Sequence, residues 1–215
     1  MVRMAKIACT ALLSLLIGIG PQLALAEDHN LLKDASFEEQ LPGKEGGWRL
    51  FEESLFSADQ ARSGSQSMFN GGFSRTVAYH PFFVGAVSGS YQEFAAEPGS
   101  RWRLTGYGLM AAPLKGTPAL GIVQISFFDA NGKDLGTVET ADSATKAKTS
   151  NEVNSQSPVG EWVFLDTGTA TAPPGTAVVH AFTIYVDFSG ANTAQGVYFD
   201  DLQLCTAENL SRCGP

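Results

Sequence analysis

Two adjacent aspartates lie within an apolar, alternating run at residues 196–204, near the C-terminal end of the chain. Side chains of a strand alternate between its faces, so Asp200 shares a face with Leu202 and Leu204. An ionised carboxylate on the core side of a strand loses its hydration at a cost of several kcal/mol unless it gains a partner. The pattern therefore predicts that Asp200 meets a cation, backbone N–H groups or a bound metal.

We expect this partner to be calcium, held by the two ends of the chain and one loop. Calcium takes about six to eight oxygen ligands from carboxylates and carbonyls at mixed sequence distances. The expected ligands are the carboxylates of Glu38 and Asp200, an additional carboxylate from Asp201, and carbonyl oxygens of Ser36 and of the turn at Ser63. The alternative is that Asp200 accepts backbone N–H groups or pairs with Arg62.

A second set of candidate residues lies on three long alternating segments, 102–110, 120–128 and 177–188. Each has one apolar face and one face that mixes aromatic rings with hydrogen-bonding groups. The mixed faces carry Arg103, Tyr107, Gln124, Tyr185 and Asp187, whereas the other face of 177–188, with His180, Phe182 and Ile184, is expected to point to the core.

Such mixed faces suit a sugar chain. Pyranose rings place their apolar C–H faces on aromatic rings, and their hydroxyls pair with amides and carboxylates. If the three segments are neighbours in one sheet, their mixed faces form one ligand surface. The alternative is an ordinary solvated sheet face.

The residues that could support catalysis are sparse. The histidines His29, His80 and His180 lack metal-ligand spacing, and no G-x-S-x-G motif is present. Glycoside hydrolysis requires two carboxylates about 5 to 9.5 Å apart, and no sequence feature brings Glu93 and Asp187 together. We therefore expect a non-enzymatic protein.

These residues must be positioned by strands. Segments rich in aromatic or β-branched residues alternate with Gly, Pro and Asn-Gly turns, and no segment has a convincing helical period. The expected strands are 54–58, 90–95, 102–110, 120–128, 161–169, 177–188 and 196–204. This pattern predicts an all-β, single-domain jelly-roll β-sandwich. The polar segment 137–158 is expected to be a long loop.

Residues 1–26 have the features of a secretory signal peptide: Arg3 and Lys6, then an apolar stretch, then Ala24-Leu-Ala26. The expected mature domain is 27–215, secreted or periplasmic and monomeric. In such an oxidising compartment, Cys205 and Cys213 are expected to form a disulfide. The net charge of −8 disfavours nucleic acid as a partner, and no later segment is long enough for membrane insertion.

Several short motifs resemble a known family. They are Asn30-Leu-Leu-Lys-Asp-Ala-Ser-Phe-Glu38, Gly46-Gly-Trp48, Ala61-Arg-Ser-Gly-Ser-Gln-Ser67 and Phe199-Asp-Asp-Leu202. In this order they resemble the β-sandwich carbohydrate-binding modules of the galactose-binding-like group, especially those attached to xylanases and glucanases. The resemblance implies non-catalytic binding of a polysaccharide or oligosaccharide on the concave face of one sheet. The calcium site is expected to be structural and away from the sugar.

A structural or adhesive envelope protein that binds a protein partner is the alternative function. A sugar-binding protein is expected to have a slot with two or more accessible aromatic rings, whereas an adhesive protein is expected to have a flat apolar patch.

Overall fold

The computed structural model describes residues 30–42, 47–72, 86–114, 119–135, 148–188 and 195–214. The predicted signal peptide lies outside these residues. Within them, no helix is long and apolar enough to cross a membrane.

The described residues form two antiparallel sheets of six strands each. The first sheet contains β1 (Arg49–Phe51), β4 (Ala86–Ala95), β6 (Ala119–Phe128), β7 (Lys148–Thr149), β8 (Val153–Asn154) and β11 (Val178–Asp187). The second contains β2 (Ser54–Ser57), β3 (Ser67–Gly71), β5 (Arg101–Leu109), β9 (Trp162–Asp166), β10 (Ala170–Thr171) and β12 (Gly196–Thr206). A short 3-10 turn, η1 (Leu210–Arg212), follows β12.

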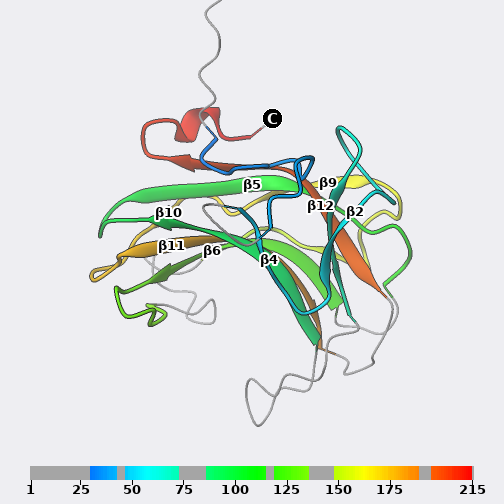
Figure 1. Ribbon diagram of the computed structural model, residues 1–215, viewed down its shortest axis with the longest axis horizontal. Helices are drawn as coiled ribbons and strands as arrows, with labels where there is room; N and C mark the ends of the chain where they lie inside the picture. Colours follow the sequence, from blue (N-terminus) through cyan, green and yellow to red (C-terminus); the bar gives the residue numbers. More distant parts are fainter. Residues whose placement is uncertain are drawn as a thin grey trace, which may run out of the picture.

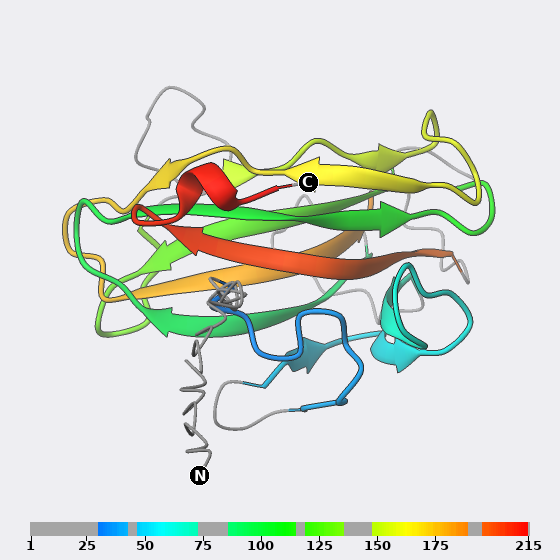
Figure 2. The same ribbon diagram turned by 90° about the horizontal axis from the view of Figure 1, so that it is seen from above.

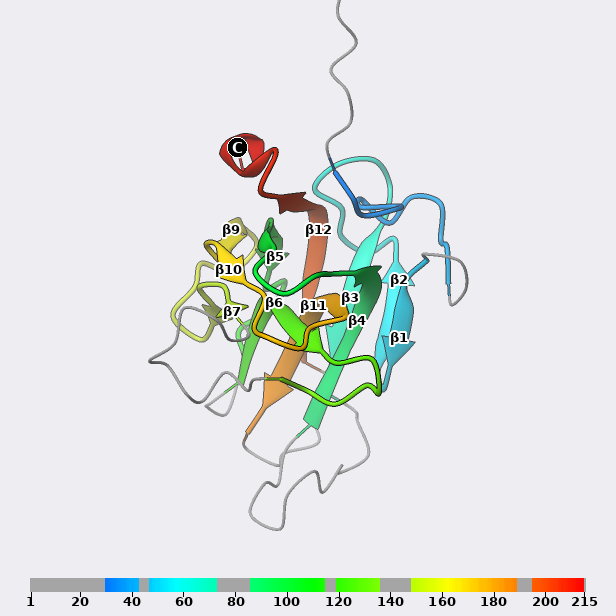
Figure 3. The same ribbon diagram turned by 90° about the vertical axis from the view of Figure 1, so that its left-hand side faces the viewer.

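The two sheets pack face to face as a β-sandwich (Figure 1; Figure 3 shows it from one end). The strand order is β1-β4-β11-β6-β7 in the first sheet, with β8 also paired to β6. The order in the second sheet is β10-β5-β12-β3-β2, with β9 also paired to β5. The predicted all-β, jelly-roll sandwich is confirmed.

The core lies between the sheets and consists of alternate residues of the long strands. Val123, Ile125 and Phe127 of β6 face Leu104 of β5 and Leu204 of β12, and all five are at most 1% exposed. The segment before β1 adds Phe37 and Trp48, whose ring centroids lie 4.9 Å apart. Burying each such side chain contributes about 1.5–3 kcal/mol.

A polar row also lies between the sheets. Asn70 of β3 donates to the Thr183 hydroxyl of β11 at 2.9 Å, and Ser88 of β4 donates to the Gly71 carbonyl of β3 at 2.7 Å. The Ser90 and Thr183 hydroxyls lie 2.8 Å apart within the first sheet. These hydrogen bonds allow small polar side chains to occupy core positions.

The strand predictions are confirmed to within a few residues, and the Cys205–Cys213 disulfide is present. The predicted loop 137–158 needs correction at its end, because β7 and β8 both pair with β6. Residues 136–147 lie outside the described part of the chain. Figure 2 shows the C-terminal turn above β5 and β12 of the second sheet.

Candidate functional site

The outer face of the first sheet carries five partly buried rings from four strands: Phe51, Tyr91, Phe128, His180 and Phe182. We call this set the aromatic groove. Tyr91 of β4 and Phe182 of β11 are direct cross-strand partners, with ring centroids 5.1 Å apart. Cross-strand pairs share a face of the sheet, so both rings point away from the core.

His180 lies in the middle of the aromatic groove. Its ring stacks on Tyr91, with centroids 4.9 Å apart and planes 17° apart, and its centroid lies 4.2 Å from that of Phe128. Burial, followed by the charge of Arg49, lowers the pKa of His180 to about 4. The imidazole is therefore neutral at pH 7.

The aromatic groove lines two adjacent hollows that share His180. One has a volume of about 430 Å³ and is lined by Phe51, Glu52, Val87, Tyr91, His180 and Phe182. The other has about 300 Å³ and extends from His180 and Glu93 to Phe128 and the turn at Asp129. Because both are lined by His180, the two hollows adjoin at this side chain.

Phe51 can lie at one end of the groove because residue 89 of β4 is a glycine. A Cβ on Gly89 would lie 2.5 Å from Phe51 Cζ, so only glycine leaves room for the ring over β4. The centroid of this ring lies 6.5 Å from that of Phe182, in an edge-to-face arrangement. This geometry is favourable for an aromatic pair.

Polar groups accompany the rings. Glu93 of β4 pairs with Arg49 of β1 through two contacts, Nη1–Oε1 at 3.0 Å and Nη2–Oε2 at 2.9 Å. Glu93 Oε1 also lies 3.3 Å from His180 Nε2. On the other side, Gln124 of β6 is the cross-strand partner of Phe182 and donates to the Ser126 hydroxyl at 2.8 Å. The site thus offers aromatic faces beside hydrogen-bonding groups.

The predicted common surface is wrong for four of its five residues; only Gln124 lies on the face of the groove. Tyr185 and Asp187 are fully buried, because the odd-numbered residues of β11 point between the sheets. The even-numbered residues His180, Phe182 and Ile184, expected in the core, point outward instead. Hydrogen bonds around Thr183 account for this orientation, since they satisfy polar groups inside.

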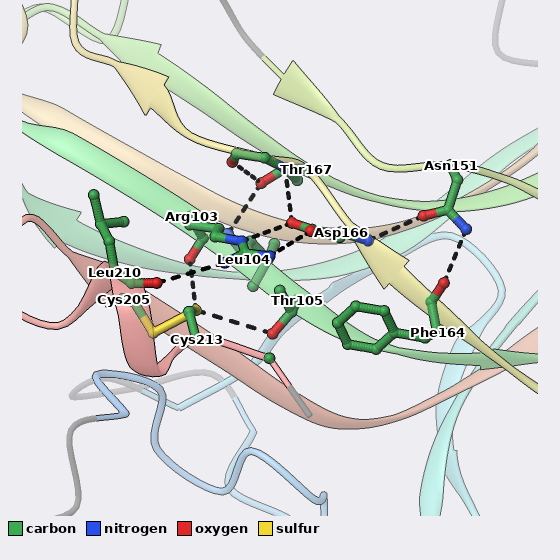
Figure 4. Close-up of polar contacts among 12 residues, drawn as sticks. Arg103, Leu104, Thr105, Asn151, Phe164, Asp166, Thr167, Cys205, Leu210 and Cys213 are labelled. Carbon is green, nitrogen blue, oxygen red and sulfur yellow. Dashed lines mark hydrogen bonds and ion pairs between the residues drawn. A yellow bond between two sulfur atoms is a disulfide. The ribbon is translucent and has the colours of Figure 1, made fainter.

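Tyr107 and Arg103 belong to β5 of the other sheet. The Arg62 guanidinium lies 3.5 Å from the centroid of the Tyr107 ring, and Phe164 contacts the same ring. Arg103 donates to Asp166 Oδ1 at 2.9 Å and to Oδ2 at 2.5 Å (Figure 4). This pairing lowers the pKa of Asp166. Arg103 is therefore engaged beside the disulfide, away from the groove.

The carboxylates of the calcium prediction surround the turn at residues 62–66. Asp200 Oδ2 accepts the backbone N–H groups of Arg62 and Ser63, and Oδ1 accepts that of Asp201 at 2.7 Å. The Asp201 carboxylate contacts the Arg62 guanidinium and the Ser63 hydroxyl.

Glu38 accepts the backbone N–H groups of Ser65 and Gln66. Within the described residues, no three His, Cys, Asp or Glu side chains are placed to share a metal ion. The N–H alternative for Asp200 is thus realised. Calcium binding stays a prediction.

The sequence did not predict the aromatic groove, because its alternating pattern allows either face of β11 to be the buried one. The outward face, with Phe182 and Ile184, is the more apolar one. A usable signal was in β4, where the polar residues Ser88, Ser90 and Gln92 share a face and leave Tyr91 on the other; Ser90 is the cross-strand partner of Thr183.

No protein-family model matches the chain, and no curated protein sequence matches it. Solved structures of similar fold include the carbohydrate-binding module TmCBM61 in complex with β-1,4-galactotriose, at 14% identity and TM-score 0.46, covering 81% of this chain and 97% of that one. Another is the CBM22-1 xylan-binding domain of Paenibacillus barcinonensis Xyn10C, at 20% identity and TM-score 0.47, covering 80% and 91%.

A third is the enzymatically active domain of bacteriophage CBA120 tailspike protein 4, at 15% identity and TM-score 0.49. The match covers 83% of this chain but only 21% of the tailspike chain. All three TM-scores are below 0.5, so these likenesses do not identify a ligand.

Proposed function

We propose that this chain is a secreted, non-catalytic carbohydrate-binding protein that holds a polysaccharide or oligosaccharide in the aromatic groove. The observation that carries the proposal is the pair of joined hollows lined by Phe51, Tyr91, Phe182, His180 and Phe128. Rings in a shallow groove suit the apolar faces of successive sugar units.

The polar groups beside the rings support the same ligand class. Arg49 and Gln124 carry N–H donors, and Glu93 carries acceptors, on either side of Phe182. Sugar hydroxyls both donate and accept hydrogen bonds, so they can use each of these groups. The rings provide most of the contact surface, and the polar groups set orientation.

The placement of the carboxylates supports a non-catalytic role. Glu93 and Asp187, the pair considered for glycoside hydrolysis, lie on opposite faces of the first sheet. Asp129, which lines the second hollow, accepts the N–H groups of Asn131 and Lys133 at the hairpin turn. Glu93 is occupied by Arg49.

The test is retention of the mature chain, residues 27–215, on a panel of insoluble polysaccharides in calcium and in chelator. We expect selective retention that Phe182→Ala abolishes and Tyr198→Ala, on the second sheet, preserves. Absence of retention on every polymer, from a protein with a cooperative melting transition, would contradict the proposal.

A protein partner on the second sheet is the other candidate function, and one observation favours it. Five residues are in register across its outer face, and the row consists of Leu55, Phe69, Tyr198, Leu109 and Trp162. Leu55 is 48% exposed at one end of the row. Leu109 is only 2% exposed, and the other three are partly buried, so the row supports a partner contact mainly through Leu55 and the rings beside it. Binding to a protein, without retention on polysaccharide, that Tyr198→Ala abolishes and Phe182→Ala preserves would favour this function.

A further inference from the structure

His180 is the one groove residue with a polar group inside both hollows, and its two ring nitrogens have different surroundings. Nε2 lies 3.3 Å from Glu93 Oε1. Within the described residues, no hydrogen bond to Nδ1 is found. The His180 side chain is 15% exposed, so the ring is partly accessible from the groove.

The position of Glu93 determines which nitrogen carries the proton. Two contacts with Arg49, one of them to Oε1 itself, orient the carboxylate with Oε1 toward His180. An unprotonated Nε2 would place its lone pair against a carboxylate oxygen. A proton on Nε2 replaces this repulsion with attraction, and a neutral imidazole then has an unprotonated Nδ1.

We propose that Glu93 holds His180 in the Nε2–H tautomer, and that Nδ1 is the hydrogen-bond acceptor for a sugar hydroxyl in the aromatic groove. This inference rests on the proposed function and adds a specificity-determining residue to it. A ligand must present an O–H group between the units that contact Tyr91 and Phe128. A sugar unit that lacks a hydroxyl at this position leaves Nδ1 unpaired and binds more weakly.

Other charged or titratable groups around His180 are consistent with this role. Tyr91 and Glu93 face it from β4, Arg49 from β1, and Asp129 lines the hollow beyond β6. Arg49 disfavours a second proton on the ring. Nδ1 therefore remains an acceptor throughout the neutral pH range.

The first test is nitrogen-15 NMR of the histidine side chains in the free, full mature protein at pH 7. We expect the His180 Nδ1 resonance to be that of an unprotonated nitrogen and Nε2 to carry the proton. A His180 ring with its proton on Nδ1 would overturn the proposal whether or not any sugar binds. Glu93→Gln is the control, because it should weaken the tautomer preference.

The second test measures affinity for two defined probes, xylohexaose and β-1,4-galactotriose. His180→Phe keeps a ring between Tyr91 and Phe128 but removes the acceptor, so we expect about fivefold or greater weakening for a probe that binds. A melting curve establishes that the variant is folded. If wild type binds a probe and His180→Phe binds it with the same affinity, the role of Nδ1 is overturned while the proposed function stands. Failure of wild type to bind any glycan would contradict the proposed function and the ligand part of the inference.

Discussion

Asp200 carries a carboxylate in a fully buried position at the bulge of β12. Desolvation raises its pKa to about 6, although the backbone N–H groups of Arg62, Ser63 and Asp201 act in the opposite direction. The nearby Asp201 charge adds to the increase. The hydrogen bonds therefore leave part of the desolvation cost uncompensated, which is the physical reason to test for a cation.

Asp200→Ala should lower the free energy of unfolding by about 2–4 kcal/mol, because three partly buried backbone N–H groups lose their acceptor. Thermal denaturation of wild type and variant, each in calcium and in chelator, checks this. The calcium prediction requires that chelation lowers the wild-type Tm and that the variant loses this dependence. If chelator does not change the wild-type Tm, the calcium prediction is wrong, and hydrogen bonds alone stabilise the Asp200 carboxylate.

His180 should make the fold sensitive to acid. Its folded pKa of about 4 lies below the unfolded value of 6.5, so the unfolded state takes up the proton first as pH falls. Stability is fully present above pH 6.5 and is lost between pH 6.5 and 4, by up to about 3 kcal/mol.

The measurement is urea denaturation of wild type and His180→Phe from pH 7 to pH 4. Asp200 acts in the opposite direction over about pH 4 to 6, but it is present in both proteins and cancels in the difference. The stability of wild type should fall relative to His180→Phe as pH decreases. A constant difference across this range would contradict a neutral, buried imidazole.

The strand β11 shows which structural features can be predicted from sequence and which cannot. Strand character followed from alternation and β-branched residues, and the segment was correctly bounded to within a residue. The sequence pattern did not determine which face of β11 is buried, because aromatic residues occupy both faces. The decision depends on Asn70 and Ser90, residues distant in the sequence whose side chains hydrogen-bond to the Thr183 hydroxyl.

Two variants of β11, one at Tyr185 and one at Phe182, test which face of the strand is buried. Tyr185→Ala creates a cavity in the core and should cost about 3–5 kcal/mol of stability. Phe182→Ala removes a partly exposed ring and should cost distinctly less. Chemical denaturation of both variants is the check, and a larger loss in Phe182→Ala would reverse the orientation of the strand.

For the molecule as a whole, the fold was more predictable from sequence than the site. Short strands, turn residues and the cysteine pair each depend on local chemistry, so they indicated a disulfide-linked sandwich. The site depends on which strands become neighbours. β5, with Tyr107 and Arg103, entered the second sheet, whereas β4, with Tyr91 and Glu93, joined β11.

The C-terminal disulfide stabilises the tail against the second sheet, near Arg103 and Asp166 (Figure 4). The Cys205→Ser/Cys213→Ser double variant should lose about 2–3 kcal/mol of stability. Glycan retention at a temperature where the variant is folded should be unchanged, because the groove lies on the other sheet. Loss of retention under these conditions would show that the C-terminal tail contributes to glycan binding, contrary to this prediction.

The outer face of the first sheet is the surface that we propose to bind the sugar. Calorimetric titration of one retained glycan into wild type, Tyr91→Ala and Tyr107→Ala compares the same substitution on the two sheets. We predict that Tyr91→Ala weakens binding about tenfold or more, as expected for loss of an aromatic contact, and that Tyr107→Ala binds as wild type does. Weakening by Tyr107→Ala with wild-type affinity in Tyr91→Ala would contradict the account.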